Sequence, residues 1–188
     1  MDDLVTADAR AWHEWLQSND DTSDGVWLVL AKKGTVTPTS LTYQSALEEA
    51  LCSGWIDGQR RGRDESTFFQ RFTPRRPRSI WSLRNVGLVD ALEEEGRMRP
   101  RGRMEADRAR ADGRWGRAYA GAAAVDVPDD LAAALDRDPA AAVLFAGLGS
   151  SERYAILHQV ITAPNPGVRA NRVVRQLELL VRKSAGDS

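Results

Sequence analysis

The spacing of apolar residues in the N-terminal third switches between helical and extended periods. Helical spacing over 6–18 predicts a helix capped by Thr6. Residues 26–31 form a run that is apolar on both faces, which is typical of a central strand. Helical spacing returns over 43–53, where Gly54 is the expected stop. This part of the chain therefore predicts one buried strand between two helices.

Two further extended runs, 55–61 and 67–73, are joined by a short polar linker and predict an antiparallel hairpin. Because side chains alternate along a strand, we assign Ile56, Phe68 and Phe72 to the core face. The opposite, functional face would then carry Trp55, Asp57, Gln59 and Arg71. A register shift of one residue would exchange the two faces.

Two helices are predicted after the hairpin. The first covers 83–95, between a cap at Ser82 and a stop at Gly96, and the second covers 101–113, which is rich in Arg and Ala. A small-residue-rich linker follows over 120–126, and the sequence beyond it is helical throughout. Four more helices are predicted over 128–137, 139–147, 151–162 and from 165 onward, with Pro128 and Pro139 in first turns. The chain is thus predicted to be α+β. A small antiparallel sheet packs with helices in residues 1–119, and a helical bundle module follows over 127–183.

The amino-acid composition limits the kinds of protein and of binding site that we expect. Hydrophobic residues make up 42% and charged residues 28%, which is ordinary for a soluble globular protein. The acidic N-terminus predicts no signal peptide, and no apolar run reaches the length of a membrane span, so we expect a cytoplasmic protein. One cysteine and two histidines cannot form a structural zinc site, and no EF-hand spacing is present, so we expect no metal; a calcium or magnesium site made of carboxylates stays open. Walker, dinucleotide and nucleophile-elbow motifs are missing, so we expect no cofactor.

Charge is distributed unevenly along the chain. Residues 54–84 hold eight arginines and three acidic residues, whereas residues 1–53 hold three basic and nine acidic residues. A positive block attracts anions even in a protein of net charge −1, so an anionic small molecule or peptide is the expected partner. The alternative is that these arginines pair with the acidic residues of the N-terminal third.

The residues expected to bind this ligand lie in the positive block. Pro74 and Pro77 stiffen the backbone around Arg75 and Arg76, and Trp81 follows, which favours an exposed site. The full predicted ligand-binding set is Trp55, Asp57, Gln59, Arg71, Arg75, Arg76, Trp81 and Asn85. We predict no catalytic residue, because no nucleophile has a base nearby in the sequence.

Three other interpretations stay open. Asp57 could instead pair with Arg71 across the hairpin and only fix the sheet. Asp57 could also act as the acid or base of an unrecognised enzyme. Nucleic acid ranks behind a small anion or peptide, but a single strand could be bound by arginines with stacking on Trp55 or Trp81. The arginines concerned are Arg60, Arg61, Arg75, Arg76 and Arg78.

Several strings of unusual composition carry a family resemblance. They are Glu49-Ala50-Leu51-Cys52, Gly54-Trp55-Ile56-Asp57, Gln70-Arg71-Phe72-Thr73-Pro74-Arg75-Arg76-Pro77, Trp81-Ser82, Glu95-Gly96-Arg97-Met98 and Gly113-Arg114-Trp115. With them the chain resembles the YdeI/OmpD-associated (OmdA) family, often called bacteriocin-protection proteins, over nearly its whole length. The string Val127-Pro128-Asp129-Asp130-Leu131 resembles the start of the family's helical module.

The same resemblance sets the functional expectation. It implies a link to protection against bacteriocins or cationic peptides and to an outer-membrane porin, with no reaction or catalytic residue to carry over. Ala163, Arg169 and Arg172 fit the family's closing string, whereas Pro164 and Val168 replace its Lys and Thr. We therefore expect a non-catalytic binding or stress-protection protein.

Overall fold

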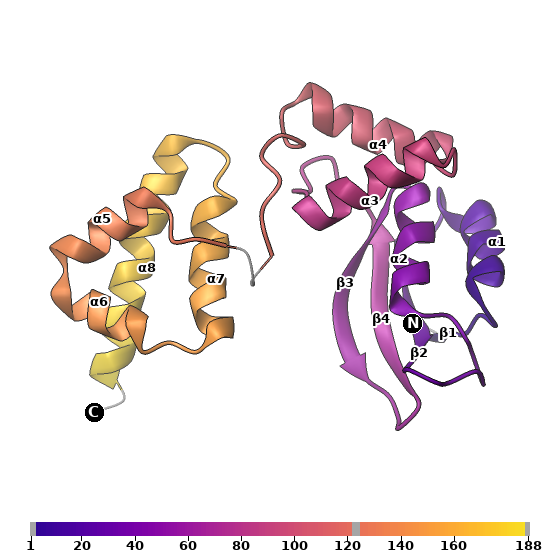
Figure 1. The fold of residues 1–188 in the computed structure, drawn as a ribbon, viewed down its shortest axis with the longest axis horizontal. Coiled ribbons are helices and arrows are strands. Elements are labelled where there is room, and N and C mark those ends of the chain that lie inside the picture. The colour runs from indigo at the N-terminus through magenta and orange to yellow at the C-terminus, as the bar shows by residue number, and fades with distance from the viewer. Residues whose placement is uncertain (1–2, 122–124, 187–188) are drawn as a thin grey trace. The chain divides into compact units, whose positions relative to one another are not determined.

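The computed structural model describes residues 3–121 and 125–186, and it is an α+β protein (Figure 1). Its internal contacts divide the chain into two compact units, which are described in turn. The first unit comprises Met1–Trp81 and Asn85–Gly116, and the second comprises Ser82–Arg84 and Arg117–Ser188. Residues 122–124 of the predicted linker lie outside the described residues.

A four-stranded sheet of order β1-β2-β4-β3 forms the centre of the first unit. Its strands are β1 (Asp3–Leu4), β2 (Val26–Ala31), β3 (Trp55–Gly62) and β4 (Thr67–Pro74). β1 runs parallel to β2, whereas β4 is antiparallel to both β2 and β3. The predicted central strand and hairpin are both confirmed. The two residues of β1 are too few to show a period in the sequence.

Four helices lie wholly or, in the case of α3, mainly in the first unit, and each was predicted from the sequence. They are α1 (Ala9–Asn19), α2 (Tyr43–Cys52), α3 (Leu83–Glu94) and α4 (Pro100–Ala111). The predicted cap of α1 is wrong: the Asp8 carboxylate, not Thr6, accepts the hydrogen bond from the Ala11 N–H at 2.9 Å. Gly54 follows α2 with φ +71°, a left-handed conformation that suits glycine, so the predicted stop is confirmed.

Aromatic rings dominate the core where α1 meets the sheet. Trp12 stacks on Trp15 with ring centroids 5.2 Å apart, and it lies 5.7 Å from Phe72. Trp55 packs edge-on against both tryptophans, at 6.3 and 5.8 Å, and is 0% exposed. Its indole N–H donates to the Asp20 carbonyl at 3.2 Å, so the buried polar atom is satisfied. This cluster stabilises the packing of α1 on the sheet.

The strand register overturns the predicted faces of the hairpin. Trp55 pairs with Pro74 and Asp57 pairs with Phe72, so these side chains share the face on which α1 packs. The assignment of Trp55 and Asp57 to the face opposite Phe72 is therefore wrong. Ile56, predicted to be in the core, lies on the other face instead. Side chains of β3 alternate as predicted only as far as Asp57, and the offset between two strands depends on the packing partners.

A β-bulge interrupts β3 after Asp57. The side chain of Gln70 is buried beneath it, and its amide N–H donates to the carbonyls of Gly58 at 2.8 Å and Gln59 at 3.2 Å. These bonds satisfy backbone groups that the bulge removes from the ladder. Beyond the bulge Phe68 lies on the core side, and its predicted burial is confirmed.

Close contact between α2 and α4 depends on a glycine. A Cβ atom on Gly102 would overlap the Cys52 carbonyl at the end of α2. The Arg99 N–H, just before α4, donates to that same carbonyl at 3.1 Å. The absence of a side chain at Gly102 thus brings the start of α4, and the arginines before it, against α2.

The second unit is a helical bundle. Its helices are α5 (Asp129–Arg137), α6 (Pro139–Ala146), α7 (Ser150–Ile161) and α8 (Pro166–Gly186), and all four predicted helices are confirmed. Pro139 lies in the first turn of α6 as expected, whereas Pro128 occupies the N-cap position of α5, one residue before its first turn. Their apolar stripes meet in one core formed by Leu131, Leu135, Ala141, Phe145, Ile156, Leu157, Val160, Val173 and Leu180.

Two arginines that fit the family's closing string hold α8 to its neighbours. The guanidinium of Arg169 donates twice to the Asp130 carboxylate of α5, at 2.6 and 2.8 Å. Arg172 donates to the Gln159 carbonyl of α7 at 2.7 Å. Their role in this structure is therefore to join helices. Although α8 has 21 residues, no helix of the described ranges is long and apolar enough to cross a membrane.

Candidate functional site

The face of the sheet opposite α1 gathers rings and guanidiniums. Alternation along β2, β3 and β4 brings Trp27, Arg61, Phe69 and Arg71 together there, because Trp27 pairs with Arg71 and Arg61 with Phe69. We call these four residues the arginine–aromatic face. Trp27 and Phe69 are half-buried, and Arg61 is exposed. Large flat apolar surfaces and planar cations thus share one accessible surface.

Arg61 is the central contact of this face. Its Cζ atom lies 3.6 Å from the centroid of the Trp27 ring and 5.6 Å from that of Phe69. The attraction between a cation and a ring face contributes about 0.5–1 kcal/mol at exposed sites. Arg63 extends the cluster towards the hairpin turn, with its Cζ 5.8 Å from the Phe69 centroid. The guanidinium of Arg61 is therefore held by rings rather than by a carboxylate.

Acidic residues leave much of the positive block unneutralised. Arg63 pairs with the adjacent Asp64 at 2.9 Å. Among the residues that the structure describes, no acid lies within ion-pair distance of Arg60, Arg61, Arg76 or Arg78. Arg60 instead lies over the Phe68 ring, 3.9 Å from its centroid. The hairpin therefore carries a local positive field on both of its faces.

The acidic residues of the N-terminal third pair with a different set of arginines. Glu48 and Glu49 bind Arg97 at 3.2 and 2.8 Å. Asp21 binds Arg101 at 2.7 Å. Glu48, Glu49 and Asp21 therefore form ion pairs with arginines outside the positive block. The arginines that pair with these acids lie just before α4 and in its first turn.

Several predicted ligand residues are buried. Trp55 lies in the core, and Asn85 is buried in α3. Trp81 is 2% exposed, and Arg75 is 6% exposed with its Cζ 3.4 Å from the Trp81 ring centroid. The ring of Trp115 lies 4.7 Å from that of Trp81 and completes this internal stack. The prediction of an exposed Arg75–Trp81 site is wrong, because the segment folds inward onto these rings.

The remaining predicted residues do not form one site. Asp57 accepts a hydrogen bond from the Tyr43 hydroxyl at 2.7 Å, which joins β3 to the first turn of α2. Arg71 lies on the opposite face of the sheet. Gln59 and Arg76 are exposed, at the bulge and after β4 respectively. Of the predicted set, only Arg71 belongs to the arginine–aromatic face.

The sequence predicted no shared surface for Trp27, Arg61 and Phe69. Two features of the sequence point to this surface. Trp27 lies in a strand at a position where its side chain is partly exposed, which is unusual for tryptophan, and Gly62 separates Arg61 from Arg63, which gives the two arginines the spacing of one face of a strand. Reading it required the pairing of β2 with β4, two strands far apart in the sequence.

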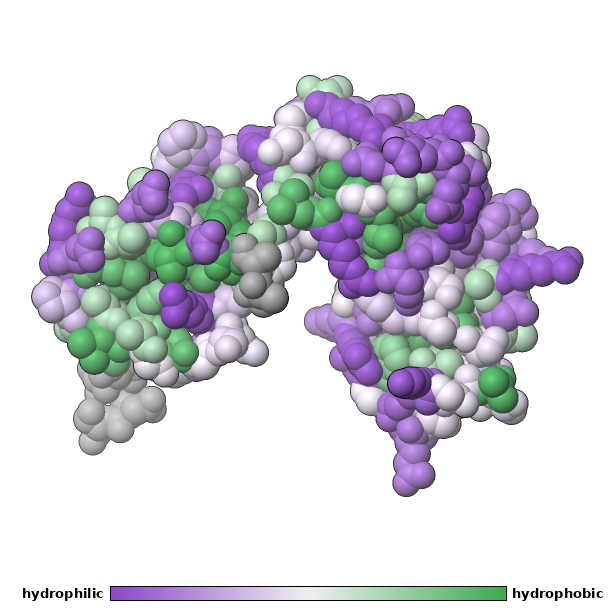
Figure 2. Space-filling model, viewed as in Figure 1, coloured by the Kyte–Doolittle hydropathy of each residue, from purple (hydrophilic) through white to green (hydrophobic). Residues whose placement is uncertain are grey.

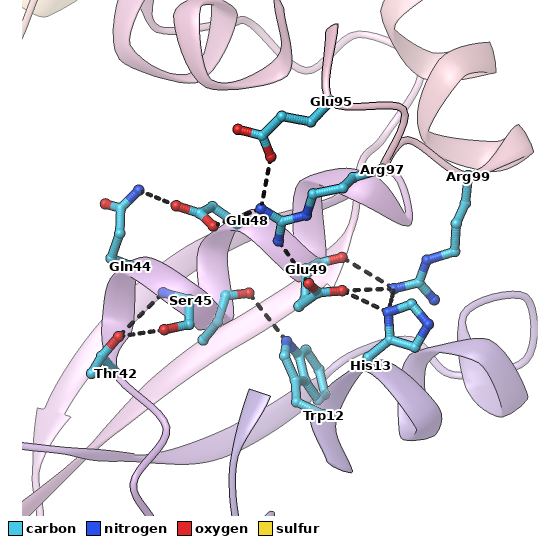
Figure 3. Close-up of polar contacts among 11 residues, drawn as sticks. Trp12, His13, Thr42, Gln44, Ser45, Glu48, Glu49, Glu95, Arg97 and Arg99 are labelled. Carbon is cyan, nitrogen blue, oxygen red and sulfur yellow. Dashed lines mark hydrogen bonds and ion pairs between the residues drawn. The ribbon is translucent and has the colours of Figure 1, made fainter. Parts of the chain in front are cut away.

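A second polar cluster centres on the α2 residue Glu49 (Figure 3). Its carboxylate accepts from His13 Nδ1 at 2.7 Å, from Arg97 at 2.8 Å and from Arg99 at 3.4 Å. Burial disfavours the charged carboxylate, but the hydrogen bonds from His13 and Arg97 outweigh burial, so the pKa of Glu49 is lowered. Glu49 thus joins α1, α2 and the segment before α4 through one charged group.

The lone cysteine contributes no reactive group at neutral pH. Cys52 is buried at the end of α2, and burial, with the nearby Glu49 charge, raises the pKa of its thiol to about 11. The thiol is therefore protonated and inert, as predicted. Among the described residues, no group of three or more His, Cys, Asp or Glu side chains is arranged to hold a metal ion.

The sequence matches two family models. Residues 4–105, more than half of the chain, match the model described as "Domain of unknown function (DUF8412)". The chain belongs to the DUF8412 family. Residues 124–183 match the model described as "Bacteriocin-protection, YdeI or OmpD-Associated" (OmdA). Neither the curated proteins nor the solved structures include a match.

These matches confirm the OmdA resemblance and correct its extent. The OmdA module is the helical second unit, whereas the strings between residues 49 and 115 lie outside the OmdA match. The DUF8412 region contains both the arginine–aromatic face and the Glu49 cluster. At the level of the family, the OmdA module indicates a role of the bacteriocin-protection type.

The OmdA module also has an apolar groove along α8. Its volume is about 460 Å³, and its lining residues are Ala134, Asp138, Val173, Val174, Leu177, Glu178, Val181 and Arg182. Hydrophobic residues gather on the visible face of this unit (Figure 2). Such a lining does not suit the anionic ligand that the positive block favours.

Proposed function

We propose that this DUF8412–OmdA protein is a non-catalytic binding protein, acting in bacteriocin or stress protection, that holds an anionic ligand on its arginine–aromatic face. The protection role is supported by the OmdA match at residues 124–183. The binding role is supported by the first unit, where the positive block of the sequence becomes a surface. The two proposals are separable, since each concerns a different unit.

One observation carries the binding proposal: the exposed guanidinium of Arg61 lies on Trp27 at 3.6 Å and has no acidic partner among the described residues. Stacking on the ring fixes the plane of the guanidinium, and the N–H groups at its edge can donate hydrogen bonds to an anion. Because the side chain is already ordered, less rotamer entropy is lost when a ligand binds. An anion that binds Arg61 would not have to break an existing ion pair.

Asp57 has no part in this proposal. Its carboxylate accepts from Tyr43 on the core side of the sheet, so it lies across the sheet from the arginine–aromatic face. Cys52 is a buried, protonated thiol. The groups that reach the face are cations and rings, which favours binding over proton transfer.

The proposal is tested by thermal shift and calorimetry with inorganic pyrophosphate, citrate and AMP. Binding to the native state raises the melting temperature by mass action. Arg61→Ala should weaken the affinity about tenfold or more, since a hydrogen bond to a charged group contributes about 1.5–3 kcal/mol. Arg103→Ala, an exposed arginine of α4, is the matched control and should bind normally. The proposal fails if no anion binds, or if Arg61→Ala binds as well as the control.

A further inference from the structure

We infer, resting on the proposed function, that the ligand of the arginine–aromatic face is single-stranded nucleic acid. Two of its bases would stack on the flat surface that Trp27, Phe69 and the overlying Arg61 guanidinium form together, and the intervening phosphate would accept hydrogen bonds from the edge of that guanidinium. The decisive juxtaposition is one guanidinium that lies over two rings, with its Cζ atom 3.6 and 5.6 Å from their centroids. A polynucleotide repeats the complementary order of base, phosphate and base.

The strand register sets the distance between the two rings. Trp27 pairs with Arg71, and Phe69 lies two residues from Arg71 on the same face, so the two aromatic residues are diagonal neighbours. The backbone positions of diagonal neighbours on a sheet are about 7–8 Å apart, and the two rings extend from positions with this spacing. That separation exceeds the roughly 3.4 Å rise between stacked nucleotides of a duplex strand. The rings therefore suit bases that have been splayed apart, as in a single strand.

Guanidiniums continue on both sides of this pair along the hairpin. Arg71 lies beside Trp27, and Arg63 lies beyond Phe69 with its Cζ 5.8 Å from that ring. Cations and rings thus alternate in the direction of β4. This arrangement suits a nucleic-acid backbone, which has one negative charge on every nucleotide. Arg63 is partly neutralised by Asp64, so Arg61 is expected to dominate.

The rings distinguish this ligand from other anions. An acidic peptide would use the guanidiniums but gain little from half-buried indole and phenyl faces. A small anion without a ring would use Arg61 alone, and a mononucleotide could occupy only one of the two platforms. Only a chain of at least two nucleotides uses Trp27, Arg61 and Phe69 together.

The test is fluorescence anisotropy of the full-length protein with 5′-labelled single-stranded dT12, at low and high salt. Competitors are dTMP, the dinucleotide dTpdT, a dT12·dA12 duplex and a poly-glutamate peptide. The informative variants are Trp27→Leu and Phe69→Leu, which keep an apolar side chain and remove the ring. Arg61→Lys keeps the charge but loses the planar stack, and Arg103→Ala is the control. Tryptophan fluorescence and circular dichroism identify any variant that fails to fold.

We expect dT12 to bind with an affinity that falls as salt rises, and to bind more tightly than its duplex. Each ring removal should weaken binding about fivefold to a hundredfold, the range measured for base stacking on aromatic residues. dTpdT should compete better than dTMP. Arg61→Lys should weaken binding, and the control should not.

Other outcomes overturn the inference and show whether the proposed function survives. If citrate or AMP binds through Arg61 but dT12 does not, the nucleic-acid inference fails and the anion-binding function stands. Equal competition by poly-glutamate, tighter binding of the duplex, or ring variants that fold and bind normally also refute it. If no anion of any kind binds, both proposals fail.

Discussion

The burial of Trp55 makes the sharpest prediction, because the sequence favoured a ligand-binding role for it. Trp55→Ala removes a side chain that is 0% exposed and packed against Trp12 and Trp15. Replacing a buried aromatic residue by Ala costs about 3–5 kcal/mol. The lost hydrogen bond to the Asp20 carbonyl, 3.2 Å long, adds about 1 kcal/mol. We therefore expect the free energy of unfolding of the first unit to fall by about 4–6 kcal/mol.

The assay is urea unfolding followed by tryptophan fluorescence. All six tryptophans of the chain lie within the first unit, so their emission reports on that unit alone. Trp27→Ala, on the half-buried arginine–aromatic face, is the matched control and should cost about 2 kcal/mol or less. Trp55→Phe should recover most of the loss, since it restores a ring but not the N–H donor.

A small effect would refute this reasoning. If Trp55→Ala lowers the unfolding free energy by less than about 1 kcal/mol, the residue is not in a packed core, because cavities of this size always cost more. Loss of anion binding together with unchanged stability would restore the original prediction that Trp55 contacts the ligand.

Three further predictions concern α2 and its contacts. Glu49→Gln should destabilise the protein at pH 7 but have less effect in acid. Because the pKa of Glu49 is lowered in the folded protein, its stabilisation is present above the unfolded pKa of about 4.3 and is lost as the pH falls through the folded pKa. The urea midpoints of the variant and the natural protein should therefore converge at low pH. Cys52 should react with a thiol reagent only after unfolding, and rapid labelling of the native protein would contradict its burial. Gly102→Ala should cost about 1–3 kcal/mol or more through overlap with the Cys52 carbonyl, whereas Gly116→Ala, with no atom nearby, should change the urea midpoint little.

Local patterns were sufficient for the elements of this fold. Local signals located all helices that the structure describes. Helical apolar spacing indicated some of them, because an amphipathic stripe must face a core. Capping residues, first-turn prolines and composition indicated the others. The run over 26–31 indicated a central strand because it is apolar on both faces, and β2 does lie between β1 and β4. Trp27 at its start is only half-buried, so one face of β2 is not fully covered. The missed elements and caps are small: β1 has two residues, and the cap of α1 is Asp8 instead of Thr6.

The candidate site depended on long-range pairing. Trp27 and Arg61 meet only because β4 lies between β2 and β3, and nothing in the local spacing of either strand specifies that order. The same pairing placed Trp55 in the core and Arg71 on the outer face, which reversed part of the predicted ligand set.

The sequence by itself determined the elements, the positive block and the OmdA character of the second unit, because each is written in contiguous residues. The tertiary structure decided which arginines remain without acidic partners. Glu48, Glu49 and Asp21 pair with Arg97, Arg99 and Arg101, whereas Arg61 stacks on Trp27. Charge partners are chosen by proximity in space, and the approach of α4 to α2 at Gly102 sets that proximity here.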